Sequence, residues 1–131
     1  MLEIDQVRLA LVDYFVSESV WRESKAIQYP DDRRNTRSAK ALRAVADYIA
    51  NLPDDDQRLA AFARCKEVWS PLPEIVFIPP RGNLAGISVT NNFACRCGFD
   101  KPMEDSEAWF SEWFEMCNLE AIAAGYAGEQ R

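Results

Sequence analysis

The sequence of 131 residues contains no histidine. Histidine is the commonest general base in enzymes and the usual ligand of a catalytic zinc ion. Its absence excludes histidine-dependent catalytic triads, zinc proteases with two histidine ligands, and zinc fingers that need histidine. The sequence also lacks a glycine-rich phosphate-binding signature and a nucleophile elbow.

Long hydrophobic runs and an excess of positive charge are missing as well. No uninterrupted apolar run approaches the ~18 residues that suggest a membrane span, and the acids Glu3 and Asp5 stand where a secretory signal carries positive charge. We therefore expect a cytoplasmic protein without membrane association. Lys and Arg total 15 against 21 for Asp and Glu, a formal charge of −6. Because an acidic chain repels phosphate backbones on average, we do not expect nucleic-acid binding.

The overall composition, with 48% hydrophobic and 27% charged residues, is that of one globular domain, which we place at residues 1–131. Helical spacing of apolar residues predicts three helices before Pro71. The first covers residues 3–20 and continues toward Pro30. The second ends at about Leu52, with Leu42, Val45, Ile49 and Leu52 inward, and the third begins with Asp54 as its N-cap.

The pattern changes after Pro71. Residues 74–78 form a short β-branched run and residues 84–90 alternate, with a turn between them, so we expect a β-hairpin. A last helix, rich in aromatic residues, is predicted to begin between Asp100 and Asp105 and to run to about Ala124, with Gly125 as its C-cap. The predicted fold class is α+β, mainly α.

The first predicted helix is apolar around most of its circumference. Ile4, Val7 and Leu11 form one stripe, which Leu9, Val12 and Val16 widen. Such a helix needs cover on more than one side. It is either the central helix of the domain or part of an oligomer interface.

The four cysteines are the sharpest chemical feature. Cys95 and Cys97 lie beside Gly98, which allows the tight turn that a metal knuckle needs. If the third and last helices pack near this turn, Cys65 and Cys117 complete a four-sulfur zinc site. Because the second pair is scattered along the chain, two other interpretations stay open, namely buried thiols on apolar stripes and a redox-active Cys95–Cys97 pair.

Positive charge is concentrated between Arg22 and Arg43, where seven basic residues stand against three acids. Arg33, Arg37 and Lys40 fall near one face of the second predicted helix and are candidate partner contacts. No aromatic residues interleave with them, as a single-strand stacking platform requires. The alternative is a solvated helix side whose cations offset the acidic last helix, within the fold or across a dimer.

The last helix carries more aromatic residues than one apolar stripe needs. Trp109 and Trp113 share one side of it, and phenylalanines share the adjacent side. Core packing is one interpretation. In the other, Trp109 and Trp113 contact a partner inside a polar rim that includes Glu112 and Glu115.

These features together favour a non-enzymatic, cytoplasmic protein-interaction domain, because no catalytic constellation is present. One subtype is an acidic binder or inhibitor of a basic partner, and a homodimer is a further alternative. A zinc-stabilised adaptor or regulatory domain that uses the four cysteines is the second interpretation. A small enzyme with carboxylate or thiol chemistry is the third, and for it the sequence identifies no catalytic residue.

Overall fold

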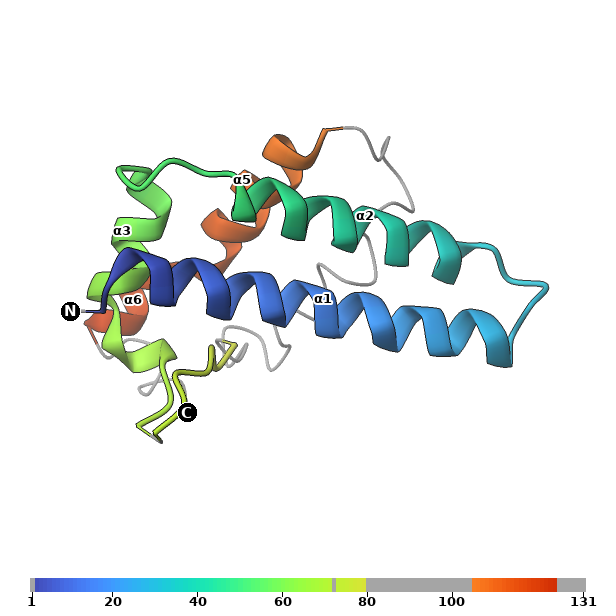
Figure 1. Cartoon of the computed structure of the whole chain (residues 1–131), viewed down its shortest axis with the longest axis horizontal. Helices are drawn as coiled ribbons and strands as arrows, with labels where there is room; N and C mark the ends of the chain where they lie inside the picture. Colours follow the sequence, from blue (N-terminus) through green and yellow to red (C-terminus); the bar gives the residue numbers. More distant parts are fainter. Residues whose placement is uncertain (1, 72, 80–104, 125–131) are drawn as a thin grey trace.

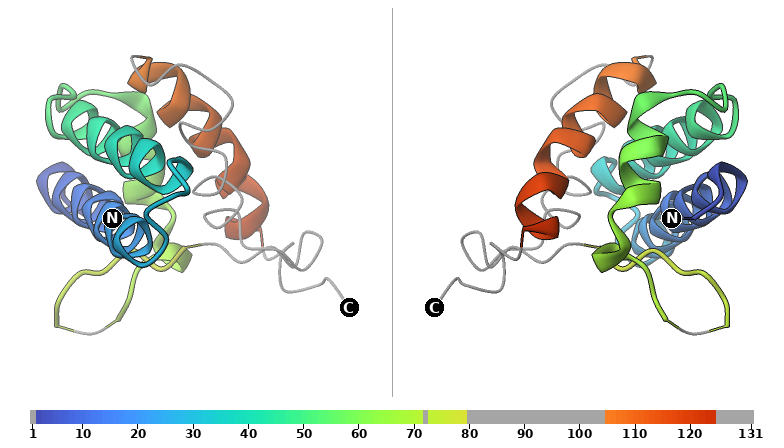
Figure 2. Two further views of the ribbon diagram at one scale, coloured as in Figure 1. Left: turned by 90° about the vertical axis from the view of Figure 1, so that its right-hand side faces the viewer. Right: turned by 90° about the vertical axis from the view of Figure 1, so that its left-hand side faces the viewer.

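The computed structural model describes residues 2–71, 73–79 and 105–124, and this part of the chain is mainly α-helical. The helices in chain order are α1 (Ile4–Gln28), α2 (Arg34–Ala50), α3 (Gln57–Arg64), the 3-10 helix η1 (Lys66–Val68), α5 (Ser106–Cys117) and α6 (Leu119–Ala123). Figure 1 shows α1 and α2 side by side as an antiparallel hairpin, with α3 crossing one end. The end-on views place α5 and α6 on one side of this hairpin, so its opposite side is turned outward (Figure 2).

Local chemistry explains the ends of the hairpin helices. A capping box in which the Gln6 side chain accepts from the Glu3 backbone N–H begins α1. The helix ends at Gln28 because Pro30 cannot continue it. At the start of α2, the carboxylate of Asp32 accepts from the backbone N–H of Arg34 (3.1 Å).

The third helix begins later than the sequence predicted. Asp56, and not Asp54, is its N-cap, and the Asp56 carboxylate accepts from the backbone N–H groups of Arg58 and Leu59. The Asp54 carboxylate instead pairs with the Arg8 guanidinium at 2.6 Å. This contact fastens the connection between α2 and α3 to the first turns of α1.

The predicted β-hairpin is wrong for the residues that the structure describes. An isolated antiparallel bridge joins Trp69 and Phe77, and the Ile78 N–H donates to the Val68 carbonyl (2.7 Å). Prolines on both sides of this segment lack amide hydrogens and interrupt a longer ladder. The segment therefore pairs with the residues just before it, while residues 84–90 lie outside the described part. The fold class is mainly α, in place of α+β.

The last predicted helix is divided in two. Asp105 caps α5 by accepting from the Ala108 N–H (3.0 Å). Asn118 then adopts a left-handed conformation, with φ 50°, and separates α5 from α6. Asparagine tolerates this region better than most residues. Gly125, the predicted C-cap, lies outside the described residues.

An aromatic cluster forms the centre of the core. Trp113 of α5 is fully buried, and its ring contacts rings from α1, α3, α5 and the segment around the bridge: Tyr14, Phe15, Phe62, Phe77 and Phe110. The inward stripe predicted for α2 is confirmed, since Leu42, Val45, Ile49 and Leu52 are all buried. One hydrophobic cluster thus joins all the helices of the described part.

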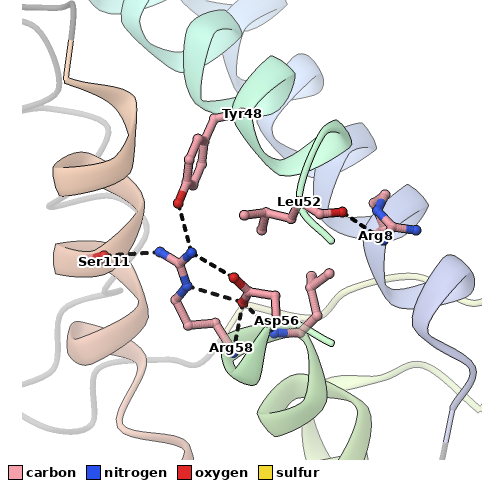
Figure 3. Close-up of polar contacts among 7 residues, drawn as sticks. Arg8, Tyr48, Leu52, Asp56, Arg58 and Ser111 are labelled. Atoms are coloured by element: carbon pink, nitrogen blue, oxygen red, sulfur yellow. Dashed lines mark hydrogen bonds and ion pairs between the residues drawn. The ribbon is translucent and has the colours of Figure 1, made fainter. Parts of the chain in front are cut away.

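A polar joint centred on Arg58 locks three helices together beside this core (Figure 3). The guanidinium donates to Tyr48 Oη of α2 (2.7 Å), to Ser111 Oγ of α5 (3.0 Å) and to Asp56 Oδ2 (2.8 Å). It also lies 4.9 Å from the ring centroid of Phe110, within the range of a cation–π contact. Asp56 therefore serves both as the cap of α3 and as the counter-ion of this joint.

The ionised form of Asp56 is favoured in the folded protein. Burial by itself would raise the pKa of Asp56, but hydrogen bonds from the side chain and backbone of Arg58 outweigh it and lower the pKa overall. A lowered folded-state pKa contributes stability above the unfolded-state pKa, near 4, and that contribution disappears as the pH falls through the folded value.

We expect Asp56→Ala to lower the free energy of unfolding by about 2–3 kcal/mol at pH 7, because both the cap and the counter-ion are lost. Asp56→Asn should lose less, since the amide oxygen still caps the helix. Denaturant unfolding at several pH values measures both effects, and the difference between wild type and Asp56→Asn should shrink from pH 6 to pH 2. Asp55→Ala, at an exposed neighbour, is the control, and an equal loss in this variant would contradict the assignment.

Candidate interaction surface

The two tryptophans proposed as partner contacts are core residues. Trp109 is 2% exposed and Trp113 is fully buried, which confirms the core interpretation and removes both indoles from the accessible surface. Their predicted rim is split, because Glu112 is half-buried and Glu115 is exposed. The structure therefore does not assemble these four residues into a binding face.

The basic residues proposed as partner contacts are exposed but do not share one site. Arg33 lines a shallow pocket with Tyr29 at the loop between α1 and α2. Lys40 lines a separate groove between the two helices, and Arg37 is exposed on α2. Near the loop, the Lys25 ammonium lies 5.4 Å from the ring centroid of Trp21, a cation–π contact within α1.

The structure describes two of the four cysteines that were predicted to bind zinc. Cys65 and Cys117 are both buried, whereas Cys95 and Cys97 lie outside the described residues. Within residues 2–71, 73–79 and 105–124, no group of three or more metal-ligating side chains is brought together. The four-sulfur zinc site stays a prediction.

The two described thiols are poor candidates for nucleophiles. Burial raises the pKa of Cys65, and the nearby carboxylate of Glu67 raises it further. Burial also raises the pKa of Cys117, far above its ordinary value. Since the thiolate is the reactive form, both thiols stay protonated and are weak nucleophiles near neutral pH. Cys65 does line a groove that also contains Arg64 and Glu115, but its thiol donates to the Glu67 carboxylate (3.6 Å), whose negative charge disfavours the thiolate.

A second set of apolar residues on α1, the α1 stripe, lies on the outward side of the hairpin, away from the buried residues of the same helix. Leu9, Val16, Val20 and Ile27 lie within about 40° of one another around the helix axis. Leu9 is 69% exposed, Val20 50% and Ile27 82%, while Val16 is half-buried. Val16 also packs against the core, so the exposed part of the stripe consists of Leu9 near the N-terminus of α1 and of Val20 and Ile27 toward the loop.

A groove of about 560 Å³ lies between α1 and α2, and Ile27 of the stripe lines it. Small side chains form part of its lining, among them Ala26, Ala39 and Ala44. Charged residues from both helices border it, namely Glu23, Lys40, Arg43 and Asp47, and Arg43 pairs with Glu23 at 3.3 Å. We call the outer face the surface made by the α1 stripe together with Glu23 of α1 and Thr36, Lys40, Arg43 and Asp47 of α2.

The outer face was only partly visible in the sequence. The stripe on α1 was recognised as too wide at Leu9 and Val16, but its continuation to Val20 and Ile27 was missed. Seven-residue spacing from 9 to 16 and from 20 to 27 is the signal that could have found it. Because Leu9 and Val20 are exposed, α1 is not a central helix surrounded by others in the described part.

Comparison of the chain with protein-family models, with curated proteins and with solved structures finds no match. None of the helices in the described ranges has the length and apolar character needed to cross a lipid bilayer.

The thiols provide a direct test of the enzymatic alternative. Native protein treated with iodoacetamide at pH 8 should leave Cys65 and Cys117 unmodified, because raised pKa values and burial suppress the thiolate. Mass spectrometry of tryptic peptides gives the extent of alkylation. The same treatment in guanidinium chloride is the control and should modify both residues. Rapid alkylation of Cys65 in the native state would contradict this assignment and favour thiol chemistry.

Proposed function

We propose that this protein is a protein-interaction domain whose outer face receives an amphipathic α-helix of a partner protein, and that it acts by binding and not by catalysis. The exposed apolar stripe on α1 carries the proposal. Single exposed apolar residues are common on protein surfaces. Several of them on one face of a helix are a mark of an interaction site.

The shape of the outer face favours a helical ligand. The stripe and the groove beside it run parallel to the two helices, and the alanines in the groove leave room for the side chains of a third helix. Recognition of a helix in such a groove uses apolar anchors spaced at i, i+3 or i+4 and i+7. The ion pair between Glu23 and Arg43 provides a polar border that would fix the position of the ligand.

The chemistry of the described residues supports binding over catalysis. Cys65 and Cys117 have raised pKa values, and the clustered side chains of Arg58 and Asp56 are engaged with each other and with Tyr48 and Ser111. These groups serve the fold. Inhibition of a basic partner by the acidic surface stays a prediction from the net charge, since the outer face itself carries both signs.

A photo-cross-linking amino acid placed at position 27 tests the proposed function. In protein expressed in its own host, the variant should form a discrete adduct with a peptide whose apolar residues follow helical spacing. The same amino acid at position 76 is the matched control, because Val76 is also exposed and apolar but lies away from the outer face. Mass spectrometry identifies the captured segment. Adducts of equal yield at positions 27 and 76, or no adduct at 27, would contradict the proposal.

A further inference from the structure

We draw no further inference here: the strongest candidate, the outer face of the α1–α2 hairpin as the contact site of one particular partner, carries nothing, because nothing in the described part of the chain shows what covers it.

Discussion

The packing of aromatic rings around Trp113 is the constraint on which the rest of the structure depends. This indole contacts rings from α1, α3, α5 and the segment at the Trp69–Phe77 bridge, so one side chain holds together elements that are far apart in the sequence. Aromatic side chains bury more apolar surface than any others. Since all these rings lie on the inner side of the hairpin, the core draws α5 to that side and leaves the outer face uncovered.

Helical periodicity was sufficient to predict much of the fold. The inward side of α2 was identified correctly because apolar residues such as Leu42 and Ile49 alternate with charged residues at a clear helical spacing. The N-cap of α3 was not identified correctly, because the three consecutive aspartates 54–56 offer equivalent local chemistry. Asp56 is selected by Arg58, whose other partners, Tyr48 and Ser111, come from distant helices. The prediction of a β-hairpin failed for a related reason. Phe77 pairs with Trp69, which precedes it in the chain and is not part of the alternating pattern of residues 84–90.

The candidate site was harder to predict, because a sequence does not state which of two apolar stripes faces the core. On α1, both stripes have helical spacing, and only the position of α5 decides that Phe15 is buried while Val20 is exposed. The aromatic helix posed the opposite problem. Trp109 and Trp113 exceed what one stripe requires, yet the core has room for both indoles, and α3 and the bridge segment supply further rings around Trp113.

The contact between α1 and α2 changes in chemistry along the hairpin. Near the N-terminus of α1 the buried side chains at this contact are apolar, whereas the buried polar residues of the described part gather toward the connecting loop: Ser19, Arg22, Asn35 and Ser38. Polar groups that become exposed regain hydrogen bonds to water, while apolar groups do not. Separation of the loop end therefore costs less free energy than separation of the opposite end. Local unfolding of the hairpin should begin at the loop and stop where the aliphatic contacts start, so that the core stays closed while the tip opens.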